Sequence, residues 1–267
     1  MAAKVDLYNN AYGSYELDAH RKVRLETYGQ DLGQTSWVTT EESNQIPKLL
    51  GLGPDSVVLE IGCGSGRYAI HVAQQTGCRV TGVDINPHGI RNANRLAQEG
   101  ALESVRFQEC DVSKGLAFAE STFHAVFAND VTCHIRARAG VFAEVYRVLK
   151  PGGRFLFSDA SVVGGIVSDQ EIAIRSSIGY YEFSPPGENE RLLTKAGFEL
   201  SSVADTSQAA AELSKRRHDA RARYSDELIA AEGAENFAGL QRFLTCVHSL
   251  SSEKRLLRLL YLAQKRA

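Results

Sequence analysis

The chain has 267 residues, 43% of them hydrophobic, which is enough to bury a large core in one globular unit. Its 30 basic and 32 acidic residues give a net charge of -2, so no overall charge attracts nucleic acid or an anionic membrane. A small-molecule substrate is therefore favoured over a nucleic-acid or membrane partner. The sequence does not decide whether the chain forms a homodimer.

The cysteines, the histidines and the two ends of the chain exclude further classes. Five cysteines without a Cys-x-x-Cys pair argue for a reducing compartment and against a disulfide framework or a zinc site. No histidine has a partner at metal-ligand spacing, so no metal site is expected. Residues 1–10 have no long apolar core, and Arg258 interrupts the apolar run 256–263, which predicts neither a signal peptide nor a membrane span. We expect a cytoplasmic protein.

Residues 1–50 are polar and aromatic, and the segment 28–42 mixes glycines with hydroxyl and amide side chains. This composition fits either a lid over a site or an arm that packs on a sheet. From residue 51 to 158, apolar runs alternate with amphipathic stretches, as they do in the βαβ units of a doubly wound α/β fold with a parallel sheet. Strands are expected near residues 56–61, 78–83, 104–109, 123–128 and 153–158.

The stretch 57–67 is an apolar run with one carboxylate, Glu60, followed by Gly62, Gly64 and Gly66, which open onto a helical pattern. Glycines let a ligand approach the backbone at the carboxyl end of a strand, so this is a candidate nucleotide site. A dinucleotide fingerprint would place a further glycine at position 67 and no carboxylate beside the pyrophosphate. Glu60 instead suits a ligand with cationic groups, such as the ammonium and sulfonium of S-adenosylmethionine (SAM).

These residues resemble motif I of the class I SAM-dependent methyltransferases, in which an acidic residue precedes three alternating glycines. The resemblance continues at Cys110-Asp111-Val112, which is similar to the family's motif III, and at the Lys-Pro-Gly-Gly turn 150–153. It implies SAM as the cofactor and a Rossmann-like methyltransferase fold with a mostly parallel seven-stranded sheet. It also implies an N-terminal helical lid at 1–50 and a SAM-binding domain at 51–267, with helical insertions at about 160–187 and 206–250.

Two acids follow expected strands. Asp84 ends the second strand, where a carboxylate can accept both ribose hydroxyls of an adenosine, and capping of the next helix is the alternative. Ile85 would then lie against the adenine. The resemblance implies that Asp111 accepts from the adenine amino group while the N–H of Val112 meets the ring; an Asx turn is the alternative for Asp111.

The fourth expected strand leads into a polar cluster, 129–134, at the carboxyl end of a central strand, where open α/β sheets place ligands. Asn129 and Asp130 are candidates to bind the SAM ammonium and to orient the acceptor. His134 is a candidate general base because its reference pKa is about 6.5, and a histidine satisfied at a helix start is the alternative.

The resemblance also points to residues outside the central strands. Trp37 is a candidate cofactor contact in the lid, and Tyr28 and Tyr180 join Asn129 and His134 as catalytic candidates. Core packing is the alternative for the aromatic residues near position 180.

Further along the chain, a helix over 191–197 and strands over 198–205 and 256–265 complete the sheet, the last strand being antiparallel. Residues 206–250 are expected to be helical. Their basic run favours a solvated helix face over an anion or RNA site, because acids border it. The run consists of Lys215, Arg216, Arg217, Arg221 and Arg223.

The chain is therefore expected to transfer the methyl group of SAM to an N or O nucleophile of a small molecule by in-line displacement. One alternative on the same scaffold is a cyclase that converts SAM into azetidine-2-carboxylate and methylthioadenosine. The other is a protein that binds SAM without turnover.

Overall fold

The computed structural model describes residues 4–267, so the first three residues of the expected lid lie outside the described part. Within that part the chain forms a seven-stranded sheet with the order β3-β2-β1-β4-β5-β7-β6. The strands are β1 (Val57–Ile61), β2 (Arg79–Asp84), β3 (Val105–Glu109), β4 (Phe123–Asn129), β5 (Leu149–Val163), β6 (Phe198–Asp205) and β7 (Leu256–Lys265). The pairs among β1 to β5 are parallel and β7 is antiparallel to both β5 and β6, which confirms the predicted topology.

The central strands follow the prediction because they are apolar runs covered on both faces. All but one of the β1 residues are buried, as are Ala125 to Ala128 of β4. β5 is longer than predicted: Leu149 already pairs with Phe123, and the register then shifts before Arg154 pairs with Ala125. The Lys-Pro-Gly-Gly turn is thus an irregularity within β5, with Gly152 at φ +73°.

Helices cover both faces of the sheet, as a doubly wound fold requires. One apolar core joins the sheet to α3 (Thr40–Leu50), α4 (Arg67–Thr76) and α5 (Pro87–Glu99). The core on the opposite face joins it to α6 (Arg138–Val148) and α8 (Glu188–Ala196). Short 3-10 turns follow β3, β4 and α7; they are η1 (Val112–Lys114), η2 (Thr132–His134) and η3 (Ser176–Ile178).

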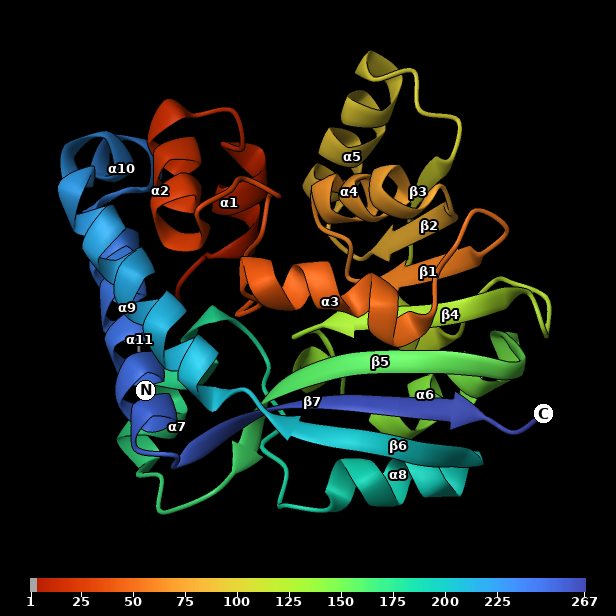
Figure 1. Cartoon of the computed structure of the whole chain (residues 1–267). Coiled ribbons are helices and arrows are strands. Elements are labelled where there is room, and N and C mark those ends of the chain that lie inside the picture. The colour runs from red at the N-terminus through yellow and green to blue at the C-terminus, as the bar shows by residue number, and fades with distance from the viewer. Residues whose placement is uncertain (1–3) are drawn as a thin grey trace.

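The remaining helices gather beyond the carboxyl ends of the parallel strands (Figure 1). They are α1 (Tyr8–Gly13), α2 (Asp18–Tyr28), α7 (Asp169–Arg175), α9 (Ser207–Arg223), α10 (Ser225–Glu232) and α11 (Ala234–Ser252). Ser168 and Glu171 form a capping box that starts α7. Because α9 packs against both α2 and α11, segments from the two ends of the chain share one helical layer.

The basic run on α9 differs from its prediction. Arg217 and Arg221 are buried, because their one-turn spacing places both on the side of α9 that meets its neighbours. Arg221 pairs with Glu232, and Arg217 donates to the carbonyl oxygen of Thr35 at 3.4 Å. The solvated-face interpretation was therefore wrong for these two residues.

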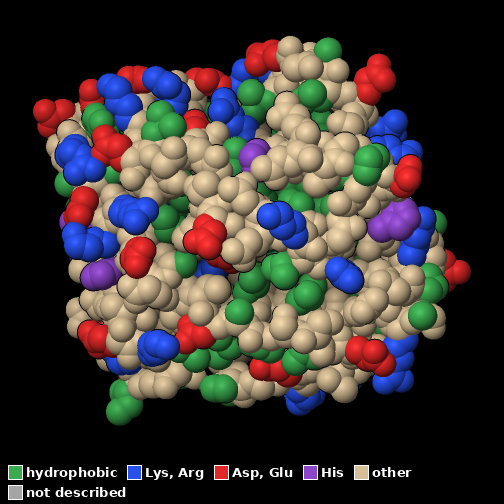
Figure 2. All heavy atoms as spheres, in the orientation of Figure 1, with side chains coloured by type: hydrophobic (Ala, Val, Ile, Leu, Met, Phe, Trp, Pro, Cys, Tyr) green, Lys and Arg blue, Asp and Glu red, His purple; other side chains and the backbone are tan. Residues whose placement is uncertain are grey.

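Two observations concern the surface. Across residues 4–267, no helix has both the length and the apolar character needed to span a bilayer. Basic and acidic side chains are interspersed on the face that Figure 2 displays. That face therefore carries no large field of one sign.

Candidate active site

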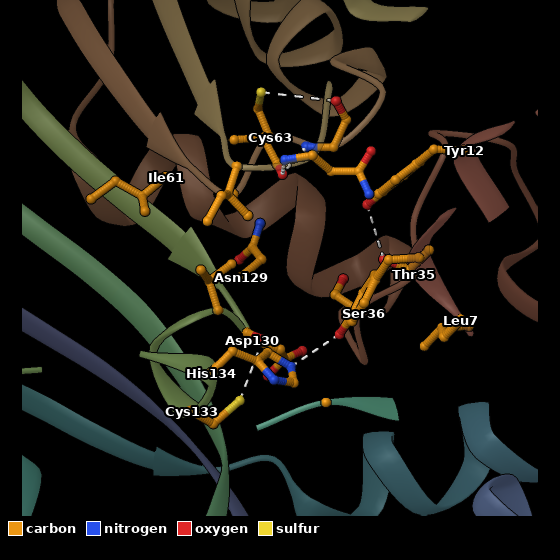
Figure 3. Close-up of a pocket in the computed structure, with 18 of the residues that line it drawn as sticks. Leu7, Tyr12, Thr35, Ser36, Ile61, Cys63, Asn129, Asp130, Cys133 and His134 are labelled. Atoms are coloured by element: carbon orange, nitrogen blue, oxygen red, sulfur yellow. Dashed lines mark hydrogen bonds between the residues drawn. The ribbon is translucent and has the colours of Figure 1, made fainter. Parts of the chain in front are cut away.

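A cavity of about 1040 Å³ lies at the carboxyl end of the parallel strands, where residues that follow β1, β2 and β4 meet the N-terminal segments. Figure 3 shows Asn129, Asp130 and His134 along its wall, the Cys63 turn above them, and Tyr12 on the facing side. The cavity is therefore lined both by residues of the sheet and by residues of the N-terminal segment, which are far from them in the sequence.

The glycine turn shapes the upper part of the cavity. Gly62 and Gly64 have φ angles of 75° and 51°, and both line the cavity. A Cβ on Gly62 would lie 2.2 Å from a methyl of Val131, and one on Gly64 would lie 2.4 Å from the Tyr12 hydroxyl. Gly66 does not line the cavity: a Cβ there would lie 2.7 Å from the Phe107 ring, so this glycine lets the start of α4 pack on β3.

Four buried polar atoms of cavity residues have no partner among residues 4–267: Glu60 Oε2, Asn129 Oδ1, Ser43 Oγ and Gln34 Nε2. Glu60 is only 3% exposed, and its Oε2 accepts no hydrogen bond; the same holds for Oδ1 of Asn129. Burial, with the nearby charge of Asp84, raises the pKa of Glu60 well above its usual range. A cationic group of a ligand beside Glu60 would favour the ionised form of this carboxyl group.

Asp84 sits at the end of β2 with both carboxylate oxygens oriented by the backbone. Oδ2 accepts from the Gly64 N–H and Oδ1 from the Asn86 N–H, each at 2.8 Å. Asn86, rather than Asp84, caps α5, since its side chain accepts from two N–H groups of the first turn. Each Asp84 oxygen keeps a second lone pair for a ligand hydroxyl. Burial raises the pKa of this carboxyl group.

Three other predicted cofactor residues line the same part of the cavity. Ile85 is 64% exposed, which leaves its side chain uncovered for a flat ligand. Asp111 accepts from the N–H and the hydroxyl of Ser113 and so forms the Asx turn that was its alternative. Its neighbour Val112 also lines the cavity.

Asp130 is buried at φ +57°, and both of its oxygens are already bonded. They accept from Arg258 Nε at 2.9 and 3.2 Å, from the Ser158 hydroxyl and from the Trp37 N–H. This carboxylate therefore does not bind a cofactor ammonium as predicted; it attaches the Trp37 segment to β4 and β7.

His134 forms a hydrogen bond through each ring nitrogen. Nδ1 lies 2.8 Å from the carbonyl oxygen of Tyr180, and because a carbonyl only accepts, Nδ1 carries the proton. Nε2 then accepts from the Tyr8 hydroxyl at 3.0 Å. Burial lowers the pKa of His134, so the ring is neutral at neutral pH. The structure thus places a neutral imidazole behind a tyrosine hydroxyl at the cavity.

A protein-family model described as a methyltransferase domain matches residues 59–157, the part that carries the glycine turn, Asp84, Asp111 and Asn129. Over 106 residues, 39% of this chain, the sequence is 39% identical to the sterol 24-C-methyltransferase of Kluyveromyces lactis. Over residues 59–157 the chain is therefore similar to the class I SAM-dependent methyltransferases.

A second relative resembles this chain over more of its length. The sterol methyltransferase-like 1 protein of Botryococcus braunii is 32% identical over 176 residues, which cover 63% of this chain and 45% of that protein. The matched part makes up only 28% of the Kluyveromyces enzyme, so the chain spans less than half the length of both relatives.

Two solved structures share the fold of this chain. Phosphoethanolamine N-methyltransferase 2 of Haemonchus contortus, in complex with SAM, has a TM-score of 0.81 at 21% identity, covering 97% of this chain and 60% of that one. The [4+2]-cyclase SpnF has a TM-score of 0.76 at 18% identity, with both chains fully covered. At these identities the likeness shows the fold of the chain and neither its activity nor its acceptor.

Two predicted catalytic residues of the chain lie outside the cavity. Tyr28 is buried and donates its hydroxyl hydrogen to the carbonyl oxygen of Ser36. Tyr180 stacks under the Arg136 guanidinium at 3.9 Å and donates to Glu182. The backbone carbonyl oxygen of Tyr180 accepts from Nδ1 of His134, which lines the cavity. Trp37, which was predicted to contact the cofactor, lines the cavity.

Tyr8 and Tyr12 are cavity residues that the sequence interpretation did not single out. They lie one turn apart on α1, and their rings stack at 6.5 Å. Their four-residue spacing in the sequence predicts that both side chains lie on one face of a helix, and this is the signal that could have identified them. No cluster of three metal-binding side chains occurs among residues 4–267.

Proposed function

We propose that this chain binds SAM in the cavity and transfers its methyl group to a small-molecule acceptor. The observation that carries the proposal is the pair of unpartnered buried acceptors, Glu60 Oε2 and Asn129 Oδ1, beside the glycine turn. A carboxylate and an amide oxygen left unpaired in a cavity favour a ligand that brings an ammonium group. This fits the amino-acid end of SAM.

The other cofactor contacts follow from the order of residues along the cavity. The ribose is assigned to Asp84, whose oxygens are oriented by two backbone N–H groups and keep lone pairs for hydroxyls. The adenine is assigned to the surface formed by Ile85, Asp111 and Val112, and Trp37 lies near the methionine end. When bound, SAM supplies an electrophilic methyl group; the chain supplies alignment and a partly dry cavity.

Tyr8 and His134 form the proton path of the proposed reaction. An acceptor hydroxyl or amine loses its proton as it attacks, and the Tyr8 oxygen can take that proton while Tyr8 passes its own to His134 Nε2. The Tyr180 carbonyl, which holds Nδ1–H, would stabilise the imidazolium that results. Asn129 lies on the same wall and would orient the acceptor.

The first 50 residues act as the lid in this proposal. Tyr8 and Tyr12 of α1 and Trp37 before α3 line the cavity. The bond from the Trp37 N–H to Asp130 attaches this segment to the sheet at 2.8 Å. Residues 51–267 then form the SAM-binding domain, and the helices after β5 and β6 complete the far wall.

The test is incubation of the pure protein with SAM, first alone and then with a metabolite extract. We expect no product with SAM alone and S-adenosylhomocysteine once the extract is added. Methylthioadenosine from SAM alone would favour the cyclase, and SAM binding without any product would favour a protein that only binds. If SAM does not raise the melting temperature, the proposal fails at its first step.

A further inference from the structure

Arg175, at the end of α7, is buried against the cavity wall. It is 1% exposed, and its guanidinium carbon lies 4.3 Å from the ring centre of Tyr181 and 5.2 Å from that of Phe243. Nη1 donates to the Tyr181 hydroxyl and Nη2 to the Ala160 carbonyl oxygen, both at 3.1 Å. Tyr181 and Ala160 line the cavity, so Arg175 sits directly behind its lining.

This cation differs from the other two arginines with fully buried side chains. Arg138 pairs with Asp159 at 2.8 Å, and Arg258 pairs with both Asp130 and Glu42 at 2.9 Å. Within residues 4–267, no carboxylate lies within 4.0 Å of Arg175. A buried charge is costly unless an opposite charge or several hydrogen bonds offset it.

The ionisable groups that act most strongly on Arg175 do not supply a negative charge. They are Tyr181, Cys133 and Cys246. Burial raises the pKa of the Tyr181 hydroxyl and of the Cys133 thiol, and it raises the pKa of Cys246 to about 11. All three are therefore neutral at neutral pH, so none of them supplies a counter-charge to Arg175.

Tyr181 connects Arg175 to the cavity, because Tyr181 lines the cavity and its hydroxyl bonds the guanidinium. Its oxygen accepts from Arg175, so its own hydrogen points away from the guanidinium. No acceptor for that hydrogen is present in the described part of the chain. A hydroxyl that accepts from a cation is a stronger donor, which suits an anionic oxygen. The wall around it is apolar, with Val5, Leu7 and Ile178.

We propose that the acceptor is an amphiphilic anion, with a carboxylate or phosphate head held by Tyr181 and balanced by Arg175, and an apolar body along the wall. The inference rests on the proposed function, because it concerns the acceptor half of the same cavity. An ammonium head is disfavoured there, because Asp130 and Asp159 are already paired with arginines. The acceptor therefore differs in charge from an alkylamine.

Trp37 provides the readout for the test, since it is the one tryptophan of the chain, lines the cavity and stacks on Phe243 at 6.3 Å. Its fluorescence is titrated in the full-length protein, first with S-adenosylhomocysteine and then with four probes at saturating S-adenosylhomocysteine. The probes are octanoate, octyl phosphate, octanol and octylamine. We expect at least one of the two anions to bind ten times or more tighter than octanol, and octylamine to bind most weakly.

Variants assign the preference to Arg175. R175M should reduce affinity for the preferred anion at least tenfold and leave octanol within about twofold, since a hydrogen-bonded charge is worth roughly that factor or more. R175K should retain the preference. R242M is the matched control, because Arg242 is exposed on α11 and the net charge changes equally. Y181F serves as a second route if R175M does not fold, and it should lose the anion preference too.

The outcomes separate the two proposals. Failure of S-adenosylhomocysteine to bind would overturn the proposed function. Normal binding of S-adenosylhomocysteine, with octylamine or octanol bound as tightly as the anions, would overturn only this inference. So would an unchanged anion affinity in R175M or, where that variant is unfolded, in Y181F. A preference for octanoate over octyl phosphate, or the reverse, identifies the head group.

Discussion

The two sides of the cavity are built in different ways. We assign the side lined by Glu60, Asp84 and Asn129 to the cofactor (the cofactor half) and the side lined by Tyr8, His134 and Tyr181 to the acceptor (the acceptor half). In the cofactor half, Glu60, Asp84 and Asn129 lie on the strands β1, β2 and β4, and Glu60 and Asn129 each have an oxygen without a partner among residues 4–267. In the acceptor half, Tyr8, His134 and Tyr181 come from three distant segments. The buried charge behind them is the cation Arg175.

The two halves therefore differ in the hydrogen-bonding groups that they offer to a ligand as well as in their position. Unpaired buried acceptors favour a ligand with donors, whereas a donor strengthened by a cation favours a ligand with an anionic oxygen. One buried network joins the halves, since Arg258 bonds Asp130 and Asp130 bonds the Trp37 N–H. Variants in each half and in this network can separate their contributions.

The largest effect is expected from the proton path of the acceptor half. Tyr8→Phe and His134→Gln should each lower kcat by about 10²–10⁴, because each removes one member of the path. SAM affinity should stay within about twofold, since neither residue is assigned to the cofactor. S-adenosylhomocysteine release in a metabolite extract and calorimetric titration with SAM measure the two quantities. A large loss of SAM affinity would show that the halves are not independent.

Removal of the network that joins the halves should mainly affect stability. Arg258→Met leaves Asp130 and Glu42 buried without their counter-charge, so the free energy of unfolding should fall by about 3–5 kcal/mol. Urea denaturation measures it. Arg255→Met is the control, because its ion pairs with Glu171 and Glu253 lie nearer the surface and should contribute about 1 kcal/mol or less. Equal losses in the two variants would contradict the role assigned to the network.

In the cofactor half, Asp84→Ala should weaken SAM binding by more than tenfold, because it removes both acceptors assigned to the ribose. The matched control is Glu109→Ala. Glu109 on β3 lies opposite Asp84 in the strand register, and its side chain is exposed and does not line the cavity. Calorimetric titration with SAM measures both variants. Unchanged affinity in Asp84→Ala would remove this residue from the site.

The smallest effect concerns the pH dependence of Glu60. Its folded-state pKa is raised by burial, so the folded protein holds this proton more tightly than the unfolded chain does. Stability is therefore lost as pH rises from the usual glutamate range through the raised pKa, by about 1.4 kcal/mol for each pKa unit. Glu60→Gln should be more stable than the wild type at high pH without SAM and should gain less from SAM.

Thermal unfolding at pH 5 and pH 8, with and without SAM, tests this prediction. The Tm difference between Glu60→Gln and the wild type should grow with pH in the absence of SAM and shrink or reverse in its presence. A difference that does not change with pH would mean that Glu60 is not the group whose charge opposes folding.

Several features could be predicted from the sequence because they depend on neighbouring residues. Apolar alternation fixed β1 to β4, and the positive φ angles at Gly62 and Gly64 explain why glycine stands at both positions of the turn. The carboxyl end of β2 placed Asp84 beside that turn, since neighbouring parallel strands end at the same edge of the sheet. The family resemblance named the cofactor on these same residues.

The tertiary structure decided what no local pattern contains. Tyr8 meets His134 across 126 positions, and Arg258 reaches Asp130 across 128. Arg217 and Arg221 are buried because α9 lies between two helices. Tyr28 donates to the Ser36 carbonyl oxygen and Tyr180 to Glu182, and neither residue lines the cavity. Local patterns therefore predicted that Glu60 and Asp84 lie at the cavity, because each is on a strand beside the glycine turn, whereas the partners of Tyr8, His134 and Tyr181 depend on how distant segments pack.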